Sequence, residues 1–152
     1  MQTLTVQSEL PADEEAGGTP AERTLTFARP IIGFSGSRRF QLAALGERYA
    51  PFMTLSSLDE PGLDFIVVAP GALFADYVIE LDGADVSLLG LRDSEEVEVL
   101  VLVSRHPGAT PTVNLMGPVV VNRRSAVASQ IVLQDAGYAV AVPVDAGSAR
   151  AR

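Results

Sequence analysis

TVNLMGPVVVNRRSAVASQIVL, residues 112–133, contains two short apolar runs joined by a polar turn. Gly117-Pro118 interrupts the first run, because proline has no N–H to give to a sheet ladder. The β-branched triplet at residues 119–121 favours a strand, and the polar residues 122–125 indicate a turn. The chain then returns with apolar residues that share one face at a period of two: Val127, Ile131 and Leu133. The stretch therefore predicts a β-hairpin entered through a proline-marked kink.

A hairpin alone is only marginally stable in water, so further strands must cover this one. The clearest of them is EEVEVLVLVS, residues 95–104, in which four valines alternate along one face. The opposite face begins with Glu96 and Glu98 and becomes apolar at Leu100 and Leu102. This pattern predicts a strand whose first half lies at a rim and whose second half is covered on both sides.

Other short extended segments, separated by turn residues, are expected at residues 1–7, 24–27, 39–45, 51–58, 63–69, 77–81 and 138–142. Residues 106–111 have the composition of a loop. Asp82 is expected to cap a short helix at residues 83–89, which Gly90 ends. No segment offers the long helical crossover that a parallel sheet needs. The sequence therefore predicts an all-β fold, a small antiparallel barrel-like or sandwich domain with at most one or two short helical turns.

The length of 152 residues fits one domain, which we expect to span residues 1–144. Residues 8–23 are rich in Pro, Gly, Ala and acids and are expected to form a mobile loop. Residues 145–152 are expected to form a flexible C-terminal tail. The side chains predicted to fill the core are Phe34, Phe40, Leu42, Leu63, Phe65, Val67, Val99, Val101, Val103, Leu115, Val120, Ile131 and Leu133.

Composition excludes several classes of protein. The chain has no Cys and a single His, His106, so disulfides, thiol catalysis and sites with several histidine ligands are excluded. The first residues carry acids where a signal peptide carries bases, and no apolar run reaches the roughly 20 residues that span a bilayer. We therefore expect a cytoplasmic protein without contact to membranes. The net charge of −8 argues against direct binding to nucleic acid.

Catalytic motifs are weak. His106 with Ser104 or Ser125 and an acid could be combined into a triad, but nothing near them resembles a nucleophile elbow, which favours a solvated loop histidine. Glu95 and Glu96 are neighbours on the expected strand and point to opposite faces, which does not suit paired acid–base catalysis. No catalytic residue, metal site or cofactor is expected.

Two further patterns favour structural roles. GFSGS, residues 33–37, has glycines but lacks the GK[ST] ending of a phosphate-binding loop and a following helix, so it indicates a turn. The pairs Arg38-Arg39 and Arg123-Arg124 are isolated in an acidic chain and are interpreted as solvated turn ends rather than RNA contacts.

The charge feature that stands out is an acidic segment at residues 76–98, in which Arg92 is the single base. Its acids are Asp76, Glu80, Asp82, Asp85, Asp93, Glu95, Glu96 and Glu98. Two interpretations stay open: a solvated face, or a docking surface for a basic partner, whose encounter complementary charge would speed. Within a docking surface, Glu96 and Glu98 are the first candidates because they share the polar end of one strand face, followed by Asp93 and Glu95.

Four blocks of the chain resemble the FliW family of flagellar assembly factors. FARPIIGF at residues 27–34 is similar to the family pattern F-x-x-G-[IL]-P-G-F, although Pro30 and Ile32 replace its Gly and Pro. Residues 52–70 resemble S-L-x-x-P-x-L-x-F-[IV]-V, and residues 112–122 resemble T-x-N-L-x-x-P-[IV]-[IV]-[IV]-N. The valine strand is the fourth block. The motif positions to which we assign structural roles are Gly33, Phe34, Pro61, Phe65, Asn114, Leu115, Pro118 and Asn122.

The resemblance implies a small, non-enzymatic, barrel-like protein that is monomeric on its own and needs no cofactor. Members of the family bind flagellin in the cytoplasm. They also bind CsrA, a basic, dimeric RNA-binding regulator, and relieve its repression of flagellin translation. The acids expected to contact CsrA are Asp76, Glu80, Asp93, Glu95, Glu96 and Glu98. A competing hypothesis is a small β-barrel enzyme or a flavin- or small-ligand-binding protein, because small barrels can hold one ligand.

Overall fold

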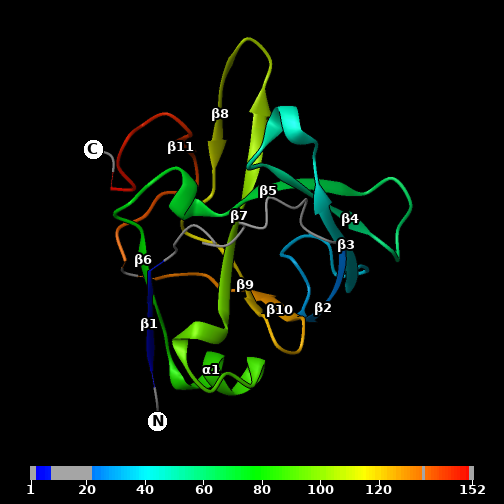
Figure 1. Ribbon diagram of the computed structural model, residues 1–152, viewed down its shortest axis with the longest axis vertical. Helices are drawn as coiled ribbons and strands as arrows, with labels where there is room; N and C mark the ends of the chain where they lie inside the picture. Colours follow the sequence, from blue (N-terminus) through cyan, green and yellow to red (C-terminus); the bar gives the residue numbers. More distant parts are fainter. Residues whose placement is uncertain (1–2, 8–21, 135, 151–152) are drawn as a thin grey trace.

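The computed structural model describes residues 3–7, 22–134 and 136–150 (Figure 1). Its strands are β1 (Leu4–Gln7), β2 (Arg23–Arg29), β3 (Arg39–Ala44), β4 (Met53–Ser57), β5 (Asp64–Val68), β6 (Val78–Leu81), β7 (Val97–His106), β8 (Ala109–Val113), β9 (Val119–Asn122), β10 (Val127–Gln130) and β11 (Val142–Pro143). The described helical segments are α1 (Gly83–Leu89) and three short 3-10 turns, η2 (Glu47–Tyr49), η3 (Pro70–Ala72) and η4 (Ser94–Glu96). The all-β prediction is confirmed.

Strand β7 closes the sheet into a barrel. It pairs with β5 through residues 101–103 and with β9 through residues 97–100, both antiparallel. The ring runs β7-β5-β4-β3-β2-β10-β9 and returns to β7, while β8 and β11 extend from β7 outside the ring. One pair, β2 with β10, is parallel. It needs no crossover helix, because the other barrel strands connect its two members.

The inner face of the barrel is filled by apolar side chains from all the strands of the ring. The fully or nearly fully buried members of this inner cluster are Leu25, Phe27, Phe40, Leu42, Leu55, Val67, Leu100, Val119, Val121 and Ala128, joined by Ile31 from the turn after β2. Because successive residues of a strand point to opposite faces, Val99, Val101 and Val120 lie on the outer face of the same wall. The barrel interior is therefore a packed core.

A second layer covers that outer face. β1 and β6 form a separate antiparallel pair, and Figure 1 shows this pair and α1 beside the lower half of β7. The outer cluster between them contains Ile79, Leu81, Leu89, Val97 and Val99, among others. β7 is thus buried on both faces between Val97 and Val101. The prediction that its second half is covered on both sides is wrong beyond Val103, where the strand becomes exposed.

The hairpin predicted at residues 119–133 is present. β9 and β10 pair in antiparallel register, with Val121 opposite Ala128 and Val119 opposite Gln130. Beyond β10 the chain stays extended, since the Ile131 and Leu133 amides donate to the carbonyls of Pro118 and Met116 at 2.9 and 2.8 Å. The predicted helix also forms: Asp82 accepts a hydrogen bond from the Asp85 amide, and Gly90 ends α1 in the left-handed region at φ 64°.

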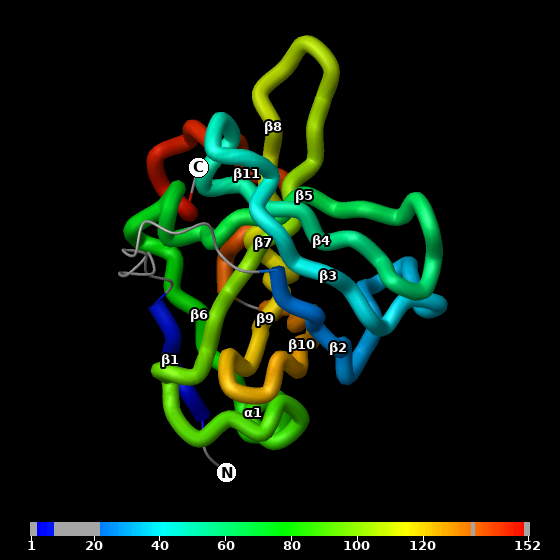
Figure 2. The backbone as a smooth tube through the Cα atoms, turned by 45° about the vertical axis from the view of Figure 1, so that its right-hand side comes forward, coloured from blue at the N-terminus to red at the C-terminus, as the bar shows by residue number. Residues whose placement is uncertain are grey.

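Several predicted boundaries are wrong. Residues 95–96 belong to η4, and residues 106–111 form the tip and second strand of the β7–β8 hairpin, which projects beyond the barrel (Figures 1 and 2). Arg23 begins β2, and the remainder of the expected loop, residues 8–21, lies outside the described residues. The strand expected at residues 138–142 is reduced to β11. The β7–β8 hairpin was missed because a strand can continue through polar residues when its partner supplies the hydrogen bonds.

The predicted core is mostly confirmed. Nine of its members are buried: Phe40, Leu42, Val67, Val99, Val101, Leu115, Val120, Ile131 and Leu133. The remaining four are only partly buried: Phe34, Leu63, Phe65 and Val103. Phe34 and Phe65 stack edge to face, with ring centroids 5.0 Å apart, at the margin of the inner cluster. The prediction omitted the buried tyrosine Tyr77, whose hydroxyl donates to the Leu115 carbonyl at 2.7 Å.

Phe40 and Phe65 differ in burial, so their truncation to alanine should lower the free energy of unfolding by different amounts. Phe40 is fully buried and contacts Phe27 and Phe65, so Phe40→Ala should lower the free energy of unfolding by about 3–5 kcal/mol. Phe65→Ala should cost clearly less, because that ring is partly exposed in the native protein. Urea denaturation of both variants with unchanged m-values is the measurement. Equal losses would show that Phe65 lies in the core after all.

Candidate functional site

The acidic segment runs from the end of η3 through β6, α1 and η4 into β7. It therefore crosses the second layer and enters the barrel wall. Asp82 and Asp85 belong to α1 and its cap, and the other six carboxylates, which are the candidates for docking, fall into two groups. One group is bound by other parts of the same chain, and the other points outward.

Asp76 belongs to the internal group. Its carboxylate accepts hydrogen bonds from the Ser148 hydroxyl at 2.7 Å and from the Ala149 amide at 2.8 Å. These bonds, the Ala149 amide first, hold the pKa of Asp76 below its ordinary value. Ala149 is buried, so Asp76 fastens residues 148–149 to the body of the protein, where the sequence led us to expect a free tail.

Glu96 joins two separate turns. It accepts from the Arg92 amide at 2.9 Å and the Arg92 guanidinium at 2.8 Å, both across η4, and from Nε of Arg124 at 3.0 Å, in the β9–β10 turn. Its side chain is only 13% exposed. The bonds to Arg92, above all from the backbone amide, and then that to Arg124 lower the pKa of Glu96 to about 2.

Glu98 is also engaged internally. It lies on the face of β7 that carries Leu100, so it points toward the end of the barrel interior. Its Oε2 pairs with the Arg23 guanidinium at 2.9 Å, and its side chain is 16% exposed. Glu96 and Glu98, the first two candidates for docking, are therefore already paired with arginines of the same chain. A partner would have to break these ion pairs before it could bind either carboxylate.

The outward group consists of Glu80, Asp93 and Glu95, all of them exposed. Glu80 lies on β6. Asp93 caps η4 by accepting from the Glu95 amide at 2.9 Å, which leaves its second oxygen outward. The Glu95 side chain makes no hydrogen bond or ion pair within the described residues. β1 connects the two elements, because it pairs with β6 and packs against η4.

The motif residues near the kink act on the backbone. Oδ1 of Asn114 accepts from the amides of Met116 and Gly117, both at 3.0 Å, which is the bonding expected of a polar residue inside this apolar run. Pro118 is buried directly before β9.

Two further motif residues lie in other turns. Gly33 takes φ 93°, which glycine adopts without strain, and Pro61 is exposed in the β4–β5 turn.

Asn122 makes a connection that the sequence did not reveal. It is fully buried. Its amide nitrogen donates to the Leu89 carbonyl at 2.8 Å, at the end of α1, while its oxygen accepts from the Arg124 amide at 2.8 Å. The asparagine thus links the hairpin turn to the helix and positions Arg124 beside Glu96. The two arginine pairs, interpreted from the sequence as solvated turn ends, each contain one arginine that forms an ion pair. Arg124 pairs with Glu96, and Arg39 pairs with Asp59 at 3.0 Å.

Other candidate chemistry is sparse. His106 is exposed, and its Nε2 lies 3.0 Å from the Thr112 hydroxyl across the β7–β8 hairpin. Within residues 3–7, 22–134 and 136–150, no group of three or more His, Asp or Glu side chains could hold a metal ion. In the same part of the chain, no helix has the length and apolar character needed to cross a membrane.

The pKa of Glu96 predicts a specific acid sensitivity. Because the pKa is about 2 in the folded protein and near 4.5 otherwise, these bonds contribute stability that is complete above about pH 4.5 and is lost as the pH falls through about 2. Glu96→Gln should therefore lower the urea midpoint at neutral pH, and its deficit should shrink on acidification. Glu95→Gln, in the same turn but without a side-chain partner, is the control. Identical pH profiles for the two variants would contradict this role of Glu96.

Comparison with known proteins places the chain in a family. The family model described as FliW protein matches residues 14–144. The flagellar assembly factor FliW of Bacillus licheniformis is 38% identical over 124 residues, which cover 81% of this chain and 86% of that protein. The corresponding protein of Bacillus subtilis is 35% identical, with the same coverage. The crystal structure of a flagellar assembly factor FliW matches with a TM-score of 0.73 and 27% identity, covering 80% of this chain and 84% of that one. The chain therefore belongs to the FliW family of flagellar assembly factors.

Proposed function

We propose that this protein binds flagellin and the RNA-binding regulator CsrA in the cytoplasm, and that it acts by switching between these partners without catalysing a reaction. While it holds CsrA, flagellin translation is released from repression. When unsecreted flagellin occupies the protein, CsrA is free to repress again. Family membership supports a role in flagellar assembly, and the acidic surface supports a basic partner.

The outward acids carry the CsrA part of the proposal. Glu80, Asp93 and Glu95 are exposed on β6 and η4, around β1. Their charge is not neutralised by internal ion pairs, unlike that of Glu96 and Glu98. Such a surface attracts a basic protein during diffusional encounter and orients it. We assign docking to these three acids and a structural role to Asp76, Glu96 and Glu98.

Flagellin is expected to depend less on charge. If it presents an amphipathic helix, binding rests on apolar side chains that enter a groove. Rim acids then contribute little to that affinity, because exposed charges are screened at physiological salt. The two partners should accordingly differ in their response to salt.

The packed barrel interior argues against the alternative of a flavin- or small-ligand-binding barrel. Such a protein needs an open volume inside the ring. Here Leu25, Phe27, Phe40 and Leu100 are fully or almost fully buried in one inner cluster. We therefore propose a protein that acts through its surface.

Charge reversal at the outward acids tests the proposal. The double variant Glu80→Arg with Glu95→Arg should slow association with CsrA at low salt, because steering depends on long-range attraction. The difference in association rate between the variant and the native protein should narrow as added salt shortens the screening length to about 8 Å. Stopped-flow or surface-based kinetics at several salt concentrations give the rate constants, after circular dichroism has shown that the variant is folded.

The matched control is Glu47→Arg with Asp64→Arg, which reverses two exposed acids on η2 and β5, outside the acidic segment. It should leave the CsrA association rate close to that of the native protein. Flagellin binding should change less than CsrA binding in the double variant. Unchanged association of the double variant with CsrA at low salt would refute docking through these acids.

A further inference from the structure

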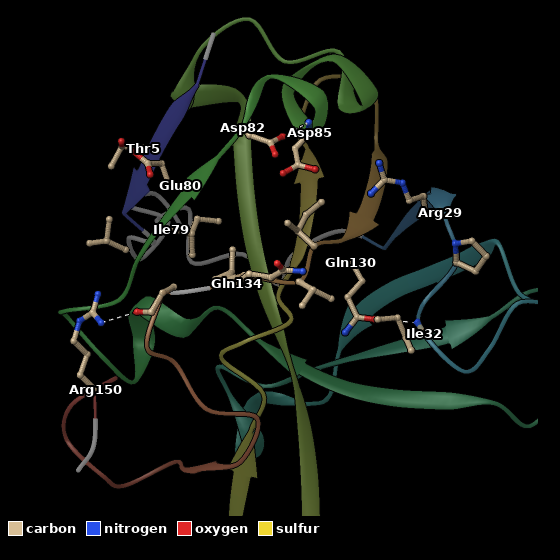
Figure 3. A pocket seen from close by; sticks show the side chains of 16 residues that line it. Thr5, Arg29, Ile32, Ile79, Glu80, Asp82, Asp85, Gln130, Gln134 and Arg150 are labelled. Carbon is tan, nitrogen blue, oxygen red and sulfur yellow. Dashed lines mark hydrogen bonds between the residues drawn. The ribbon is translucent and has the colours of Figure 1, made fainter. Parts of the chain in front are cut away.

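A groove of about 1120 Å³ lies between β6 and the extended residues that follow β10. Figure 3 shows Glu80 and Ile79 on one side of it and Arg29, Ile32 and Gln130 on the other. Asp82 and Asp85 stand at one end, and Arg150 stands near the opposite end. None of the roles assigned above to the barrel or to the outward acids explains this groove.

One wall of the groove is an unpaired backbone edge. β2 pairs with β10 in parallel as far as Arg29 opposite Ser129, and the chain then turns away at Pro30. Ile131 and Leu133 direct their amides to the opposite side, to Pro118 and Met116. Because alternate residues of an extended chain direct their N–H and C=O groups to opposite edges, those of Val132 face the groove. They have no hydrogen-bond partner within the described residues, so the strand position that β2 leaves is vacant there.

The other wall, along β6, is also a backbone edge, but part of it is occupied. The N–H and C=O groups of Val78 both bond the Tyr138 hydroxyl, at 3.0 and 2.8 Å, and so point away from β1. Glu80 is two residues further along β6, so its backbone groups point the same way. No other described residue forms a hydrogen bond to the backbone groups of Glu80 on that side. Because the groups of Val78 are occupied by Tyr138, the Glu80 backbone groups alone remain open on this wall, and the edge along Val132 is the one that can accept a strand.

Three of the side chains around these edges are apolar and exposed. Ile32 is 67% exposed, Val132 43% and Val78 37%, and all three line the groove. Only six large apolar residues in the described part of the chain are exposed, so half of them gather here. Exposed β-branched side chains next to unpaired backbone groups are the surface that an added strand covers.

The acidic side chains Asp82 and Asp85 are concentrated at one end of the groove. Asp82 and Asp85 lie together at the end near α1, where Arg29 is the base that lines the groove. Burial, and then the neighbouring charge of Asp82, raise the pKa of Asp85. A cation placed at this end would be favoured by both carboxylates.

We propose that this groove binds an extended peptide segment of another protein, which adds a short strand along Val132 in the position that β2 vacates. The segment spans about four residues at roughly 3.3 Å each. It carries β-branched or other apolar side chains at alternate positions, which contact Ile32, Val78 and Val132. An Arg or Lys at one end lies beside Asp82 and Asp85. The groove shares Glu80 with the surface proposed for CsrA, but the added strand pairs along Val132 and does not use the Glu80 carboxylate.

Two synthetic peptides test the proposal on the native protein. They are Arg-Thr-Val-Thr-Val-Thr and its reversed sequence, each with blocked ends, because the strand can run in either direction. Titration into isotopically labelled protein, followed by amide NMR, should give saturable binding of at least one peptide with shifts centred on Val132 and Glu80. Methylating either the valine nitrogens or the threonine nitrogens of that peptide removes the donors along one edge of its strand. One of the two methylated forms should bind about tenfold or more weakly, because the donors that face Val132 lie along that edge.

Variants of the protein provide the second readout. Val132→Pro removes the backbone donor and should abolish binding, whereas Val132→Ala keeps the donor and should weaken binding only moderately. Asp82→Asn with Asp85→Asn keeps a helix-capping side chain and should weaken binding of the Arg peptide but not of its Gln analogue. Asp64→Asn, an exposed acid on β5, is the matched control.

Three results would overturn the proposal. The first is the absence of saturable binding of either peptide up to about 1 mM. The second is binding that tolerates methylation of the valine nitrogens and also methylation of the threonine nitrogens, which would indicate contact through side chains alone, as with a helix. The third is self-association of the free protein that Val132→Pro abolishes, which would assign the groove to a second copy of the chain.

Discussion

The burial of β7 on both faces is the constraint on which the rest of the structure depends. A strand whose two faces are apolar must be covered twice. The inner face of β7 meets the other barrel strands, and the outer face meets β1, β6 and α1. Its two edges bond β5 and β9 and thereby close the ring. Figure 1 shows the consequence: β7 runs along the middle of the molecule, with the second layer on one side and β2, β3 and β4 on the other.

Arginines decide which acids remain available on the surface. Arg124 and Arg92 neutralise Glu96, and Arg23 neutralises Glu98. An exposed ion pair stabilises little by itself, yet Glu96 also bonds a backbone amide and joins η4 to the hairpin turn. Within the acidic segment, internal pairing leaves Glu80, Asp93 and Glu95 as exposed acids without an ion pair among the described residues. The net charge of the chain therefore does not show which of its acids are available to a partner.

Sequence patterns predicted the elements whose cause is local. Alternating valines identified β7, Asp82 and Gly90 identified the ends of α1, and the polar turn identified the β9–β10 hairpin. What stayed hidden depends on residues far apart in the chain. Arg23 meets Glu98 across 75 positions, and no periodicity encodes such a pair. The β7–β8 hairpin was missed because its polar residues are ordered by strand pairing, and the groove arises only once β2 departs from β10.

Chemical footprinting of carboxyl groups tests most directly the division between structural and outward acids. Carbodiimide coupling to a small amine, read by mass spectrometry, reports how fast each carboxylate reacts. In the free protein, Glu80 and Glu95 should react rapidly, while Glu96 and Asp76 should react slowly because internal donors hold them. Addition of CsrA should protect Glu80, Asp93 and Glu95 and leave the slow group unchanged. Rapid labelling of Glu96 in the free protein, or unaltered labelling of the outward acids in the complex, would contradict the account.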